Sequence, residues 1–194
     1  NKSTMNTIVA QERSRSKIPS KKFALYIACA SIMMMFAAFT SAYVVRQSAG
    51  NWLEFRLPSI FWYNTIVLIA SSITLHLSRS NFKKGNTLLY RSFLTLTFVL
   101  GAAFVVLQYQ AWLALQTMGI ELTGNPSGAF IYVISGVHAA HILGGLAVLT
   151  VAMIHAFMLP HNVTPARSLR FDLTLTYWHF VDFLWIYLIV FFSL

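Results

Sequence analysis

Charged residues are scarce in this sequence, and acidic ones are the scarcest. Only 10% of the 194 residues are Asp, Glu, Lys or Arg, and only five of these are acidic. A soluble domain carries about 25% charged residues. Because 57% of the residues are hydrophobic, the chain has too few charges to cover a soluble surface. The composition excludes a soluble globular domain and predicts an integral membrane protein.

Cysteine and the common catalytic motifs are also lacking. Cys29 is the single cysteine, so no disulfide can form within the chain. The sequence has no glycine-rich phosphate loop, no nucleophile elbow, no C-x-x-C and no H-E-x-x-H, so none of these motifs points to an enzyme class. No short apolar segment with a cleavage site precedes the first long apolar run. We therefore expect that run to stay in the membrane as an anchor.

What the sequence does contain is five apolar runs, each long enough to cross a bilayer. A basic tail at residues 1–22 precedes a transmembrane domain at residues 23–194. The sequence predicts an all-α fold, an integral membrane bundle of five transmembrane helices. The predicted spans cover about residues 23–45, 59–78, 92–116, 129–159 and 171–194.

Lysine and arginine are concentrated on one side of this predicted topology. Twelve of the 14 basic residues lie in the tail and in the second and fourth loops, and only Arg46 and Arg56 lie in the first loop. The positive-inside rule then places the N-terminus in the cytoplasm and the C-terminus in the periplasm. The net charge of +9 is explained by topology, and no nucleic-acid partner is predicted.

The last run carries a polar pair near its middle. His179 and Asp182 are three residues apart, so they share one helix face, and Trp178 and Trp185 flank them. A carboxylate at membrane depth costs about 2.5–3.5 kcal/mol on insertion scales, so it normally faces protein or water and has a partner. One interpretation is a hydrogen bond that fixes helix packing; the other is a proton or ligand site. Packing is favoured, because polar groups commonly join helices inside membrane bundles.

The fourth run has two chemically different faces. Gly136, Ala140 and Gly144 recur at every fourth position and predict helix packing, because small residues let another helix approach closely. His138 and His141 lie on a different face. They are three residues apart and so can also share a face of the helix.

The short connection at residues 160–170 predicts that the fourth and fifth runs are antiparallel neighbours. In such a pair, residues at equal depth have numbers with a nearly constant sum. His138 is then level with Asp182, and His141 is level with His179. The sequence predicts two stacked polar rungs that act as a structural clamp between these helices.

A metal site is not predicted. His138 and His141 form an H-x-x-H pair, but a zinc site needs at least a third ligand. Asp182 and His179 have suitable ligand atoms, but nothing in the sequence indicates that they meet this pair at a metal. Polar pairs that lock helices together are the commoner use of such residues. Gln108 and Tyr109 of the third run are expected to make further polar contacts between helices.

Two C-terminal motifs resemble those of a known family. Residues 177–182, Tyr-Trp-His-Phe-Val-Asp, followed by Trp185, are similar to the terminal-helix signature of subunit III of the haem–copper cytochrome c oxidases. Residues 135–141, Ser-Gly-Val-His-Ala-Ala-His, followed by two glycines, resemble that family's small-residue helix with H-x-x-H. The resemblance covers nearly all of the chain after Lys22 and is to the short, five-helix bacterial form.

The resemblance implies an accessory, non-catalytic subunit of a proton-translocating terminal oxidase in the bacterial inner membrane. It implies packing mainly on subunit I, with subunit II and other respiratory-complex subunits as further partners. It also implies that the subunit holds phospholipid and supports proton uptake and catalytic lifetime. Haem and copper are expected in partner subunits, and no cofactor is expected in this chain. Two family glutamates fall at Ile32 and Ala111, so their proton-handling roles are not carried over.

Other functions stay open at this point. The chain is compatible with the equivalent subunit of a quinol oxidase or of a nitric-oxide-reductase-like complex, because the electron-donor site is expected on other subunits. A small proton-conducting transporter is a further alternative, because histidine and aspartate within membrane spans mark proton pathways. Inverted repeats or broken helices would support a transporter, and the sequence shows neither.

Overall fold

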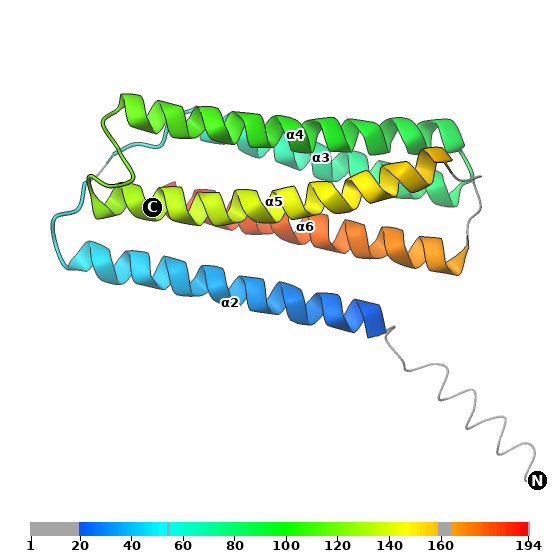
Figure 1. Cartoon of the computed structure of the whole chain (residues 1–194), viewed down its shortest axis with the longest axis horizontal. Helices are drawn as coiled ribbons and strands as arrows, with labels where there is room; N and C mark the ends of the chain where they lie inside the picture. The colour runs from blue at the N-terminus through cyan, green and yellow to red at the C-terminus, as the bar shows by residue number, and fades with distance from the viewer. Residues whose placement is uncertain (1–19, 54, 159–163, 194) are drawn as a thin grey trace, which may run out of the picture.

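The computed structural model describes residues 20–53, 55–158 and 164–193. Within these ranges the regular structure is helical, and five helices are each long and apolar enough to cross a membrane. This confirms the predicted fold class. The side of the membrane on which each terminus lies stays a prediction. The helices are α2 (Ser20–Ser48), α3 (Ile60–Lys83), α4 (Thr87–Thr117), α5 (Pro126–Met158) and α6 (Pro165–Ser193) (Figure 1).

The helices extend beyond the apolar runs that predicted them. α4 begins at Thr87, five residues before its predicted span, and α6 begins at Pro165, six residues before its own. The predicted 1–22 tail lies outside the described residues up to position 19, and its last three residues form the start of α2. Polar residues at the ends can continue the backbone hydrogen bonding of a helix, so hydrophobicity locates the membrane-crossing part better than the helix ends.

α5 and α6 each begin at a proline that follows a capping residue. Asn125 precedes Pro126, and its Oδ1 accepts a hydrogen bond from the backbone N–H of Ser127 at 3.0 Å. Thr164 precedes Pro165, and its Oγ1 accepts from the backbone N–H of Arg167 at 3.3 Å. A capping side chain followed by proline at the first helical position is a known helix-start pattern, because that position needs no N–H donor.

The five helices run side by side with their long axes nearly aligned (Figure 1). α6 contacts α2, α3 and α5, whereas α3 and α4 form a close pair and α5 contacts α4 and α2. In its most apolar stretch α6 has 44% of its residues buried, against 17% for α2. α6 is therefore the central helix, and α2 lies at the edge of the bundle.

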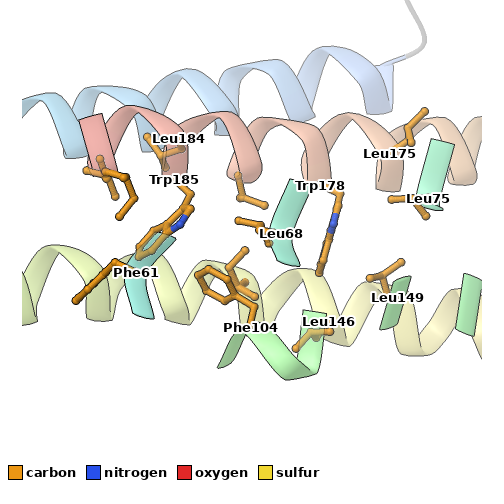
Figure 2. Packing of buried hydrophobic residues seen from close by; sticks show 14 of the residues in the cluster. Phe61, Leu68, Leu75, Phe104, Leu146, Leu149, Leu175, Trp178, Leu184 and Trp185 are labelled. Atoms are coloured by element: carbon orange, nitrogen blue, oxygen red, sulfur yellow. The ribbon is translucent and has the colours of Figure 1, made fainter. Parts of the chain in front are cut away.

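The core is built around two tryptophans of α6, Trp178 and Trp185, both completely buried. Figure 2 shows their rings among Leu68 of α3, Phe104 of α4 and Leu146 of α5. These side chains come from four helices, so the two indoles hold the bundle together at its middle.

The glycines that permit this packing are not the predicted ones. A Cβ on Gly145 would lie 2.8 Å from Cζ3 of Trp178, and one on Gly101 would lie 2.9 Å from Cη2 of the same ring. Of the predicted packing residues, Ala140 and Gly144 are exposed and Gly136 is half-buried. Within the described residues, the nearest atom to a Cβ on Gly136 or on Gly144 would lie at 3.8 Å, so the close approach of another helix over Gly136, Ala140 and Gly144 stays a prediction. The four-residue spacing locates a stripe of small residues along the helix. The position of the Trp178 ring decides at which residue a side chain would block the packing of the two helices.

Candidate functional site

His179 of α6 faces α3. Its Nδ1 is hydrogen-bonded to the hydroxyl of Ser72, and the ring of His76 lies nearby, with 6.3 Å between the ring centroids. The predicted partner, His141, instead has its own Nδ1 within 2.7 Å of the carbonyl of Val137, one turn earlier in α5. The predicted His141–His179 rung is therefore not formed.

Asp182 lies one turn further along α6 and also faces α3. Its side chain is almost completely buried, and the residue is 5% exposed. Neither carboxylate oxygen has a hydrogen-bond partner within the part of the chain that the structure describes. Ser72 lies beside the carboxyl group and is close enough to interact with it. Its hydroxyl is also hydrogen-bonded to His179, and a serine hydroxyl can accept one hydrogen bond while it donates another.

His138 is enclosed by aromatic rings instead of polar groups. It is completely buried, and neither ring nitrogen has a partner among the described residues. Its ring stacks on Trp185, with 4.9 Å between centroids, and meets Phe104 edge-on at 5.8 Å and Phe36 at 6.3 Å. The predicted polar rung between His138 and Asp182 therefore contains no hydrogen bond.

The rungs fail because equal depth does not mean a shared direction. The constant sum of residue numbers sets the level of a residue along two antiparallel helices, but not the side of the helix from which the side chain leaves. α5 and α6 are neighbours as predicted, yet α6 presents His179 to Ser72 of α3. The face of α5 that carries His138 meets the ring of Trp185.

Three hydrogen bonds between described residues in the apolar part of the bundle join α6 to α3 instead. Besides the bond between His179 and Ser72, Nε1 of Trp178 donates to the hydroxyl of Ser71 at 3.1 Å. Nε1 of Trp185 donates to Oγ1 of Thr65, also at 3.1 Å. These hydroxyl residues of α3 were not among the predicted site residues. Their only signal was a set of hydroxyls in an apolar run, which often bond their own helix backbone.

A buried hydrogen bond between two amide side chains joins α3 to α4. Nδ2 of Asn64 donates to Oε1 of Gln108 at 2.9 Å, and both residues are buried. Gln108 thus lies between the helices. Tyr109 is 60% exposed on the outside of α4. Asn64 was missed because one amide in an apolar span gives no periodic signal.

The bundle also carries an ion pair near the start of α6. Nε of Arg79 lies 2.6 Å from Oδ1 of Asp172, and Nζ of Lys22 lies 3.9 Å from Oδ2. The pair connects the end of α3 and the start of α2 to α6. These ends carry the basic residues that predict the cytoplasmic side.

At the same end a cavity of about 640 Å³ lies among α2, α5 and α6. Its wall is mostly apolar, with Val148 and Val151 of α5 as examples, and His155, Arg167 and Arg170 line its basic end. A second groove of about 420 Å³ lies between α3 and α6 and contains His76, His179 and Asp182. Among the described residues, no group of three or more His, Cys, Asp and Glu residues could hold a metal ion.

Residues 21–194 match the family model described as cytochrome c oxidase subunit III. The chain belongs to this family. It is 32% identical to cytochrome c oxidase subunit 3 of Corynebacterium diphtheriae over 166 residues, which cover 81% of this chain and 80% of the relative. It is 30% identical to the probable cytochrome c oxidase subunit 3 of Nocardia farcinica over 166 residues, covering 80% and 78%.

A subunit 3 from Thermostichus vulcanus is 26% identical over 192 residues, which cover 95% of this chain and 92% of the relative. The resemblance inferred from the C-terminal motifs is therefore confirmed. In this member of the subunit III family, the motif residues Trp178 and Trp185 form the centre of the bundle, while His179 and Asp182 face the groove at α3.

Proposed function

We propose that this chain is the accessory subunit III of a bacterial haem–copper terminal oxidase, a cytochrome c oxidase of aerobic respiration. The match to the subunit III family over residues 21–194 carries this proposal. The chain packs on subunit I, with subunit II in the same complex, and crosses the inner membrane five times. Haem and copper lie in the partner subunits, and this chain provides a rigid membrane-embedded body beside them.

The proposed topology has the basic end of the bundle in the cytoplasm. Lys83 and Lys84 at the end of α3 and Arg91 near the start of α4 support it, together with Arg167 and Arg170 near the start of α6. These residues gather at one end because consecutive helices are antiparallel. Lysine and arginine near helix ends favour the cytoplasmic side of the membrane.

The proposal includes a bound phospholipid in the cavity among α2, α5 and α6. The apolar wall at Val148 and Val151 suits acyl chains, and Arg167 with Arg170 at the basic end suits a phosphate headgroup. Arg170→Gln should lower the phospholipid that copurifies with the complex, as counted by mass spectrometry. Lys84→Gln is the control, because Lys84 is an exposed cation of the α3–α4 turn that does not line the cavity. Equal lipid in both variants would refute this part of the proposal.

Purification tests the main proposal. A tagged chain extracted in mild detergent should bring down haem-containing subunits, identified by mass spectrometry and by the haem absorption spectrum. The haem spectrum and the electron donor that supports turnover also separate a cytochrome c oxidase from a quinol oxidase. A chain that purifies without any haem protein would contradict the proposal.

Depletion tests the accessory role. A complex stripped of this subunit should keep its haem and copper signals and begin turnover normally, but lose activity in fewer turnovers than the intact complex. Loss of a haem or copper signal would count against a subunit that binds neither. An unchanged catalytic lifetime would count against the supporting role.

A further inference from the structure

Arg91, near the start of α4, is held in a fixed position against the end of α5. Its Nε donates a hydrogen bond to the carbonyl of Ala156 at 2.8 Å. Its guanidinium lies over the ring of Phe157, with 5.3 Å between Cζ and the ring centroid, which is a cation–π contact. Because two adjacent residues of α5 hold the guanidinium, the group loses little conformational freedom when a ligand binds to it.

The outer part of this guanidinium has no anionic partner in the described chain. An arginine side chain has five N–H donors, and the hydrogen bond to Ala156 uses one of them. Among the described residues, the four donors on the terminal nitrogens form no hydrogen bond, and no acidic side chain forms an ion pair with Arg91. Four donors are therefore available to an anion from outside the chain.

The depth of Arg91 matches the level of lipid phosphate groups. α4 has 31 residues, from Thr87 to Thr117, so its middle is at residue 102. At a rise of about 1.5 Å per residue, Arg91 lies about 16 Å from this middle. The hydrocarbon core of a bilayer is about 30 Å thick, so its boundary lies about 15 Å from the centre. The guanidinium is thus expected at the boundary between acyl chains and headgroups.

Arg91 also lines an open groove on the outside of the bundle. The groove has a volume of about 760 Å³ and lies along the first half of α4, beside the end of α5 (Figure 1). Its polar lining residues all lie in the first three turns of α4, and Leu96 and Val99 continue the wall toward the middle of the helix. Val99 lies about 12 Å deeper than Arg91, at about 1.5 Å per residue. The groove therefore has a cationic end at headgroup level and an apolar wall below it.

We propose that this groove binds an anionic phospholipid, whose phosphate group accepts hydrogen bonds from Arg91 and whose acyl chain lies on Leu96 and Val99. A planar guanidinium can donate two parallel hydrogen bonds to a phosphate. The lining contains no Asp or Glu, so the cationic amine of a zwitterionic headgroup finds no partner there. The match is therefore best for a headgroup with a net negative charge.

This site is separate from the cavity among α2, α5 and α6, because no residue lines both. It also goes beyond the proposed function, since it does not depend on which complex the chain joins. A second lipid at this position would attach to the outer surface of α4, on the side of the bundle formed by the start of α4 and the end of α5.

A transmembrane helix of another protein fits the groove less well. Close contact between membrane helices uses small residues, because they let the two backbones approach. Leu88 and Leu96 of α4 and Phe157 of α5 instead project at this surface and are 75%, 44% and 53% exposed. A flexible acyl chain can follow such an irregular surface, whereas a rigid helix would be held away from it.

Photoaffinity labelling tests the site. The full-length protein, with the subunits that accompany it, is placed in phosphatidylcholine nanodiscs. These contain a trace of either phosphatidylglycerol or phosphatidylcholine with a photoreactive group in the acyl chain. Peptide mass spectrometry should find several-fold more adducts with the phosphatidylglycerol probe at Leu96 and Phe157. Equal labelling by the two probes would overturn the proposal, and so would labelling no stronger than around Val106, which is exposed on α4 outside the groove.

Replacement of the cation gives a second test. Arg91→Gln should lower labelling by the phosphatidylglycerol probe by about tenfold, as for the loss of one hydrogen bond to a charged group. Lys84→Gln is the control, because Lys84 is an exposed cation of the α3–α4 turn that does not line the groove. It should leave the labelling unchanged. Full labelling of Arg91→Gln, or an equal loss in both variants, would overturn the proposal.

A third variant keeps Arg91 and its bond to Ala156 intact. Val99→Trp places an indole on the apolar wall and should lower phosphatidylglycerol labelling at Leu96 several-fold. Val106→Trp is its matched control, because Val99 and Val106 are 54% and 58% exposed on the same helix and only Val99 lines the groove. Equal labelling of these two variants would overturn the proposal, even if Arg91→Gln does not accumulate in membranes. A chain that purifies without haem proteins would refute the proposed function, but its labelling would still decide the lipid site.

Discussion

The ring of Trp178 lies directly against the backbone of Gly145. A Cβ at Gly145 would be 2.8 Å from Cζ3 and 3.0 Å from Cε3 of the indole, closer than a side-chain carbon can normally approach. Because Trp178 is completely buried and its Nε1 is bonded to Ser71, the ring has little freedom to move away. This contact fixes how closely α5 and α6 can pack.

Gly145→Ala should therefore destabilise the bundle. Overpacking of a filled core typically costs about 1–3 kcal/mol, which exceeds the roughly 1 kcal/mol that alanine gains over glycine in a helix. Thermal unfolding of the detergent-solubilised chain, followed by circular dichroism, measures the change. Gly144→Ala is the matched control, because beyond the local helix backbone the nearest atom to its Cβ would be Oη of Tyr177 at 3.8 Å. It should be neutral or slightly stabilising, and equal losses in both variants would contradict this account.

The contact between His179 and Ser72 should show energetic coupling. A double-mutant cycle with Ser72→Ala and His179→Phe should give a coupling energy of roughly 0.6 kcal/mol, the average found for hydrogen bonds between membrane helices. Unfolding in a denaturing detergent provides the free energies. A parallel cycle with His141→Phe and His179→Phe should give coupling near zero, because those side chains are not bonded to each other. Stronger coupling between His141 and His179 than between Ser72 and His179 would instead support the predicted contact between the two histidines.

The ion pair at the basic end should stabilise the packing of α6 on α3. Arg79→Gln removes the close contact at 2.6 Å and should lower the free energy of unfolding by up to about 1 kcal/mol, since partly exposed pairs contribute little. Lys22→Gln should have a smaller effect, because its contact is longer, at 3.9 Å, and its side chain more exposed. Added salt should reduce the Arg79 effect. A larger effect for Lys22 than for Arg79 would contradict this reading.

Membrane topology can be tested by cysteine labelling in a Cys29→Ala background. A membrane-impermeant thiol reagent added to intact cells should label Thr123→Cys, in the α4–α5 loop, and spare Lys84→Cys, in the α3–α4 turn. Both positions are exposed. The reverse labelling pattern would overturn the predicted orientation.

The sequence by itself determined the five helices, because crossing a bilayer demands long apolar runs whatever their neighbours. It also carried the family motifs around Trp178 and His138, since these depend on residue order alone. Helix starts were placed too late at Pro126 and Pro165, because hydrophobicity does not record capping.

Only the tertiary structure decided which residues meet. Gln108 signalled a polar contact, but Asn64 as its partner follows from the packing of α3 on α4. His179 and Asp182 share a face in any helix, yet that face turns toward α3, because the large rings of Trp178 and Trp185 set the rotation of α6 in the core. Rotation about a helix axis is fixed by the volumes and shapes of facing side chains. A spacing rule within one helix contains no information about those neighbours.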